Sequence, residues 1–107
     1  MISFEEWKKN ELKVAKIISV EDIPGKDKLY KLQIDLGSEQ RQIVAGLKQE
    51  YSKEELEGHL IVVVSNLEPA RFAGLESQAM LLAAKNREGK YRLVTIDESV
   101  EPGTLVE

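Results

Sequence analysis

Two uninterrupted apolar runs of strand length constrain the fold of this chain more than any other feature. Leu60–Val64 and Met80–Ala84 are continuously apolar, which is typical of largely buried β-strands. The segment between them contains Pro69, which can fix a turn, and Gly74, which can adopt backbone conformations closed to other residues. We therefore expect two buried strands to hold a rigid connection that displays polar side chains on a barrel rim.

Further strands are expected on both sides of this segment. Leu12–Val20 and Tyr30–Leu36 contain alternating apolar residues, and shorter β patterns cover residues 40–45 and 91–96. Three strands, a short helix and two more strands is the order of a five-stranded Greek-key barrel. The sequence thus predicts an all-β fold and a single domain over residues 1–107. The strand at 91–96 is additional to the five strands of the barrel.

Two short helices are predicted, because each begins with a capping box, in which a serine and a glutamate satisfy free backbone N–H groups. Ser3-Phe-Glu-Glu6 starts the first, which is expected over about Phe4–Asn10 within an N-terminal segment of residues 1–11. Ser52-Lys-Glu-Glu55 starts the second, which lies between strands and which Gly58 would end.

The first strand is irregular. Leu12, Val14, Ile18 and Val20 share one face of a regular strand, and Ile17 breaks the alternation. Such a break suits a long strand that bends around a barrel.

The charge distribution is more informative than the total, a net charge of −4. Residues 24–48 and residues 66–92 each hold five Lys/Arg against three Asp/Glu, whereas the excess acid lies in residues 49–65 and 93–107. A local basic stripe can neutralise a few phosphates in spite of an acidic total. A net charge of −4 is not what the overall composition of a nucleic-acid binder predicts, so any nucleic acid at such a stripe is expected to bind with modest affinity and a shallow salt dependence.

Catalysis, cofactors and membranes find no support. There is no cysteine, and His59, the only histidine, follows a helix stop, where it is usually a solvated residue. Neither a metal-ligand spacing nor a Gly-rich phosphate loop is present, and no stretch approaches a membrane span. With no signal peptide at the start, we expect a cytoplasmic protein. From the missing catalytic and metal-binding patterns, we expect that it is not an enzyme and holds no metal or cofactor.

Three motifs resemble the tRNA-binding domain found at the C-terminus of many bacterial methionyl-tRNA synthetases, in free-standing tRNA-binding proteins and in endothelial-monocyte-activating-polypeptide-like factors. The main motif reads Asn66-Leu67, Pro69, Arg71, Gly74, Ser77, Met80, and the others are Asp27-Lys-Leu-Tyr-Lys31 and Gln42-Ile-Val-Ala-Gly-Leu47. The chain departs from the family pattern at Ala79 and Ala15, where the family usually has glycine. The resemblance runs from about Leu12 to Ala84.

The resemblance implies an OB-fold barrel that binds tRNA by shape without strong sequence preference. It places Lys28, Asn66, Arg71, Ser77 and Met80 in the tRNA-contacting region. The full set of candidate contact residues is Lys28, Lys31, Arg41, Asn66, Arg71, Ser77, Gln78 and Met80.

Structural interpretations of these residues stay open. Lys28 and Lys31 can be edge-strand charges that discourage aggregation, Asn66 can cap a turn, and Ser77 can bond only local backbone. Met80 can belong to the core. Phe72 and Tyr30 are the available stacking aromatics, and Tyr30 is expected to be buried.

The family also forms homodimers through segments outside the barrel, so residues 1–11 and the tail, 98–107, are candidates for dimer contacts. An alternative is that the tail only covers one barrel end. The resemblance implies either an independent tRNA-binding protein or an accessory subunit of methionyl-tRNA synthetase. Two other functions stay open, a chaperone-like binding of polypeptide and a pure dimerisation module.

Overall fold

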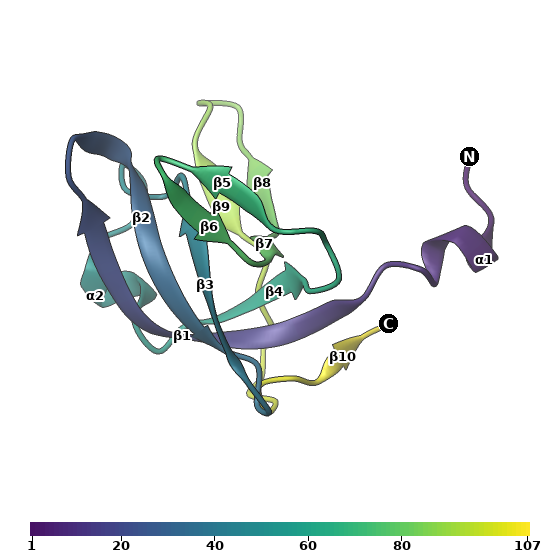
Figure 1. The fold of residues 1–107 in the computed structure, drawn as a ribbon. Coiled ribbons are helices and arrows are strands. Elements are labelled where there is room, and N and C mark those ends of the chain that lie inside the picture. The colour runs from purple at the N-terminus through teal and green to yellow at the C-terminus, as the bar shows by residue number, and fades with distance from the viewer.

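The computed structural model describes all 107 residues and is almost entirely antiparallel β-structure (Figure 1). Its main sheet has the strand order β3-β2-β1-β4-β7, with β10 paired to β1. The strands are β1 (Leu12–Ile23), β2 (Lys26–Asp35), β3 (Gln40–Ala45), β4 (Leu60–Val64), β7 (Met80–Leu81) and β10 (Leu105–Val106). The sheet curls so that β3 approaches the segment before β7, which gives the predicted all-β, OB-like barrel.

Two hairpins stand at the end of the barrel where β1 turns into β2 (Figure 1). One hairpin is β5 (Ala70–Phe72) with β6 (Leu75–Ser77), and the other is β8 (Ala83–Lys85) with β9 (Tyr91–Leu93). The expected rigid connection between two strands is therefore itself a hairpin.

The apolar run at 80–84 does not form one buried strand. β7 pairs with β4, the backbone changes partner at Leu82, and β8 then pairs with β9. The Leu82 carbonyl accepts a hydrogen bond from Val94 N–H at 3.0 Å, just beyond β9. The strand expected over residues 91–96 is β9, and it ends at Leu93 rather than at Ile96.

The two helices differ in how well they are held. α2 (Lys53–Leu56) has a complete capping box at Ser52 and buries Leu56 fully. α1 (Phe4–Trp7) ends three residues earlier than predicted and buries no side chain, although the Ser3 hydroxyl accepts from Glu6 N–H. Because α1 packs no side chain against the barrel, nothing stabilises a further helical turn, and the helix ends early.

The irregularity in β1 is confirmed, but Val20 does not share a face with Leu12, Val14 and Ile18. Ala15 and Ile17 alternate into the main core, which leaves Ile18 on the opposite face, 42% exposed. The pairing with β2 then shifts register between Ile17 and Ser19, and this extra residue returns Val20 to the core.

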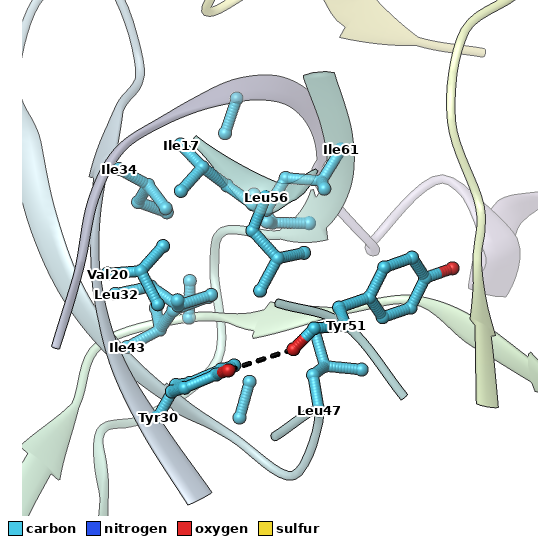
Figure 2. Packing of buried hydrophobic residues seen from close by; sticks show 14 of the residues in the cluster. Ile17, Val20, Tyr30, Leu32, Ile34, Ile43, Leu47, Tyr51, Leu56 and Ile61 are labelled. Atoms are coloured by element: carbon cyan, nitrogen blue, oxygen red, sulfur yellow. Dashed lines mark hydrogen bonds between the residues drawn. The ribbon is translucent and has the colours of Figure 1, made fainter. Parts of the chain in front are cut away.

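The main core lies inside the barrel and is built from branched aliphatic residues of β1 to β4 together with Leu47 and Leu56 (Figure 2). Two tyrosines reach across it. The buried hydroxyl of Tyr30 donates to the Tyr51 carbonyl at 2.8 Å, and the Tyr51 hydroxyl accepts from Leu93 N–H at 3.0 Å. The expected burial of Tyr30 is confirmed, and its hydroxyl joins β2 to the loop before α2.

The C-terminal tail lies along β1 of the same chain. Val14 N–H donates to the Thr104 carbonyl at 2.9 Å, and Gly103 N–H donates to the Val14 carbonyl at 2.7 Å. Gly103 and Gly37 meet backbone to backbone at positive φ: a Cβ at Gly37 would lie 2.6 Å from the Pro102 carbonyl oxygen. The tail is therefore fixed to the turn between β2 and β3 by a contact that leaves no room for side chains.

Candidate nucleic-acid interface

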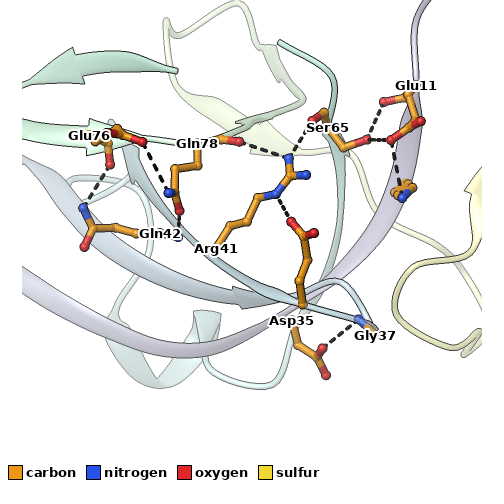
Figure 3. Close-up of polar contacts among 10 residues, drawn as sticks. Glu11, Asp35, Gly37, Arg41, Gln42, Ser65, Glu76 and Gln78 are labelled. Atoms are coloured by element: carbon orange, nitrogen blue, oxygen red, sulfur yellow. Dashed lines mark hydrogen bonds and ion pairs between the residues drawn. The ribbon is translucent and has the colours of Figure 1, made fainter. Parts of the chain in front are cut away.

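Ser77 and Gln78 join the two edges of the barrel through their side chains. The Ser77 hydroxyl accepts from Val44 N–H at 3.0 Å, and the Gln78 side-chain oxygen accepts from Gln42 N–H at 3.0 Å. Gln42 returns a bond from its amide nitrogen to the Glu76 carbonyl at 2.9 Å (Figure 3). We call this junction between β3 and residues 76–78 the side-chain seam. Both predicted contact residues are thus engaged in closing the barrel.

Arg41 supports the same junction through its guanidinium group. Its guanidinium donates to the carbonyls of Ser65 at 2.5 Å and Gln78 at 3.2 Å, and it pairs with the Glu39 carboxylate (Figure 3). The side chain is partly buried, with 23% of its surface exposed. Because its donors already bond to backbone oxygens and to the Glu39 carboxylate, fewer of them are free for a phosphate.

The Asn66 side chain bonds the N-terminal segment, residues 1–11, to the barrel. Its side-chain oxygen accepts from Glu11 N–H at 2.9 Å, and its amide nitrogen donates to the Lys9 carbonyl at 2.6 Å. Beside it, the Glu11 carboxylate accepts from the Ser65 hydroxyl at 2.7 Å and pairs with Lys13. The Ser65 bond and then Lys13 hold the pKa of Glu11 below its usual range.

The remaining predicted residues are exposed to different degrees. Lys31 forms an ion pair with Glu21, its cross-strand partner, at 3.1 Å. Arg71 donates to the Gly74 carbonyl at 2.8 Å within its own hairpin turn. Lys28 is exposed and forms no ion pair, and Met80 is 52% exposed rather than part of the core. Of the eight candidates, Lys28, Arg71 and Met80 are the most available to a ligand.

The structure adds basic residues that motif reasoning missed. Six of the fifteen Lys and Arg residues form ion pairs with carboxylates, including Lys48 and Lys53, which both bind Asp22. Most of the unpaired ones lie on the β1–β2 turn and the two hairpins, at one end of the barrel (Figure 1). We call this set the cationic rim. It comprises Lys26, Lys28, Arg71, Lys85, Arg87, Lys90 and Arg92. The signal that could have found it is the cluster of four basic residues between 85 and 92.

An apolar groove of about 640 Å³ lies among the same elements. Leu29 at the start of β2, Phe72 of β5 and Tyr91 of β9 all line it, so it joins the three segments that carry the cationic rim. Phe72 is 49% exposed and Tyr91 is 40% exposed. The Lys85 ammonium group lies over the Tyr91 ring, 5.6 Å from its centroid, which brings the rim into contact with the groove lining.

Other kinds of site are not formed. His59 is partly buried after α2, and its backbone groups bond to Leu56 and Ile17. No group of three or more His, Cys, Asp or Glu side chains could hold a metal ion. Neither α1 nor α2 has the length and apolar character needed to cross a membrane.

Comparison with known proteins identifies the family. Residues 12–105 match the family model described as "Putative tRNA binding domain". The methionine–tRNA ligases of Archaeoglobus fulgidus and Thermotoga maritima are 48% and 50% identical to 98% of this chain, which spans only 16% of their length.

Solved structures show the same fold over full-length chains. A MetRS related protein from Pyrococcus horikoshii superposes with a TM-score of 0.93 at 38% identity, covering 100% of this chain and 98% of that one. The CsaA chaperone protein from Picrophilus torridus gives a TM-score of 0.90 at 30% identity, with 100% of both chains covered. The resemblance inferred from three sequence motifs is thereby confirmed, and this chain belongs to the tRNA-binding domain family.

Proposed function

We propose that this domain binds tRNA through its cationic rim, by contacts with phosphates and with the shape of the folded RNA rather than by reading base sequence. The observation that carries the proposal is the cationic rim itself, in a chain that belongs to a tRNA-binding family. Loops at one end of an OB-like barrel are a common place for such binding.

The acidic total does not oppose this. Residues 26–28, Arg71 and residues 85–92 carry seven basic residues and only Asp27 and Glu88 as acids, whereas the whole chain has a net charge of −4. A polyanion is therefore attracted to the rim and repelled from the rest of the surface, which orients it. The number of phosphates that these seven cations can neutralise sets the upper limit of the salt slope of binding.

Titration of labelled total tRNA at two salt concentrations tests the proposal. Arg71→Ala and Arg87→Ala should each weaken binding by about 1–3 kcal/mol and lower the salt slope by about one. Lys16→Ala is the matched control, because Lys16 is exposed and unpaired but lies mid-barrel on β1, opposite Leu60 and Asp35. Absence of binding at low salt, or an equal loss in Lys16→Ala, would contradict the proposal.

The rim would raise the local supply of tRNA, either for an independent protein or for a methionyl-tRNA synthetase that this domain accompanies. Similarity to a domain of methionine–tRNA ligases supports the second arrangement. Co-purification of the domain with the synthetase, lost on adding salt or a competing domain, would indicate the second arrangement. Absence of co-purification would indicate an independent protein.

Homodimer formation is part of the same proposal. α1 exposes Phe4 and Trp7, and the tail exposes Val100 and Leu105, none of which is covered by the barrel. A second copy could cover this apolar surface and bring two cationic rims to one RNA, which raises avidity. Light scattering should give a dimer mass that Phe4→Ala lowers toward the monomer; a monomeric parent protein would exclude the dimer.

A second candidate function is binding of unfolded polypeptide, which the apolar groove and the similarity to CsaA chaperone proteins favour. It predicts that the domain suppresses aggregation of an unfolded client and that Arg87→Ala does not affect this activity. A pure dimerisation module predicts a strong dimer without either activity.

A further inference from the structure

We infer that the apolar groove takes one unstacked nucleobase of the bound RNA, while the flanking phosphates lie on the cationic rim. This inference rests on the proposed function and adds to it a chemically distinct subsite. It concerns the groove between β3, β5 and β9.

The groove is open and apolar, unlike a packing defect. Thirteen of its sixteen lining residues are hydrophobic, and three large ones, Phe72, Met80 and Tyr91, keep about half of their surface exposed. Exposed aromatic and thioether side chains around a concave surface are typical of ligand sites. The face of a base can stack on such rings whatever its identity.

The charges around the groove favour a nucleotide over a neutral apolar segment. The Lys85 ammonium already lies over the Tyr91 ring, and Arg71 precedes Phe72 on the same hairpin. A base that enters the groove keeps its two phosphates outside, within the region of these cations. Glu68, the only charged lining residue, repels phosphate, so the backbone is directed away from the groove interior and toward the rim.

The groove is poorly equipped to read the edge of a base. Ser77 and Tyr91 carry its other polar side-chain groups, and the Ser77 hydroxyl is already bonded to Val44 N–H and to the Ala79 carbonyl. With the Tyr91 hydroxyl as its one free side-chain donor, the groove would accept different bases by stacking. A subsite of this kind strengthens binding without imposing a sequence, which agrees with recognition of tRNA by shape.

The test uses the full chain and a single-stranded oligouridylate octamer with one central 2-aminopurine, whose fluorescence falls on stacking. Wild-type protein should quench the probe. Phe72→Ala and Tyr91→Ala should weaken binding of the probe and of total tRNA by about 5- to 100-fold. Phe72→Tyr, which keeps the ring, should bind as wild type. Ile18→Ala is the matched control, because Ile18 is similarly exposed but lies outside the groove.

The salt slope separates stacking from charge. Phe72→Ala should leave it unchanged, whereas Arg71→Ala should lower it. If tRNA binds and Arg71→Ala weakens it but Phe72→Ala does not, the base subsite is wrong and the proposed function stands. If wild-type protein binds no tRNA, the proposed function itself is wrong.

The experiments also distinguish two other possible occupants of the groove, a polypeptide and a second copy of the chain. If a neutral leucine-rich octapeptide binds in a Phe72-dependent way and the RNA probe does not, the groove serves polypeptide. If Phe72→Ala changes the mass measured by light scattering, the occupant is a second copy of the chain. Either result would overturn the inference.

Discussion

Replacing Ser77 by alanine tests whether the side-chain seam holds the barrel together. The substitution removes the acceptor of Val44 N–H, at 3.0 Å, and the donor to the Ala79 carbonyl. Ser77 is buried, and Val44 is partly buried at the edge of β3. A main-chain N–H left without its partner in such a place costs about 1–3 kcal/mol. For a domain of this size that corresponds to a fall in Tm of roughly 4–20 °C.

The assay combines thermal unfolding with tRNA titration at a temperature where both proteins are folded. We expect Ser77→Ala to lower Tm and to leave tRNA affinity unchanged. Ser38→Ala is the control, because Ser38 lies on the exposed turn before β3 and its side chain bonds to nothing; it should change stability by less than about 0.5 kcal/mol. An unchanged Tm together with weaker tRNA binding would refute the seam and make Ser77 an RNA contact.

Three further outcomes are expected. Gly37→Ala should be more destabilising than Gly25→Ala in urea titrations, because both residues have positive φ but only Gly37 meets the tail backbone; equal losses would show that the contact is unimportant. Asn66→Ala should speed hydrogen exchange of the Glu11 amide and barely change tRNA affinity, and a large loss of affinity would make Asn66 an RNA contact. Asp22→Asn removes a carboxylate whose pKa Lys53 and then Lys48 hold below its usual range. Since that stabilisation exists above the pKa of the unfolded chain, the wild-type advantage should persist from pH 5 to 8 and shrink below about pH 4; an advantage that does not depend on pH would contradict it.

The barrel strands were predictable because each depends on local pattern. Residues 61–64 are buried as the continuous apolar run indicates, with Leu60 partly exposed, and the alternation in residues 30–36 places Tyr30, Leu32 and Ile34 in the core. The expectation of a binding module rather than an enzyme is also confirmed by the family. Val20 was expected on the face of Leu12, Val14 and Ile18 but lies in the main core, because a bulge is fixed by pairing between strands rather than by the sequence of one strand.

The candidate site was harder to predict because its residues differ in partners that lie far along the chain. Ser77 and Gln78 have the chemistry of RNA contacts, and only the approach of β3, more than thirty positions earlier, engages them. Lys31 is neutralised because the β1–β2 register sets it opposite Glu21, whereas Lys28 has no such partner. Which basic residues stay available to a ligand is therefore a property of the strand register and cannot be read from their positions in the sequence.

The side-chain seam has a consequence for how this protein folds. Its bonds join residues 33 to 37 positions apart, whereas the β1–β2 and β2–β3 hairpins join near neighbours. Because long loops are entropically costly to close, the three-stranded meander should form before the seam does. Substitutions in the seam would then accelerate unfolding and leave the folding rate almost unchanged, so that the lifetime of the closed barrel depends on these side chains together with the backbone bond from Gln78 N–H to the Gln42 carbonyl.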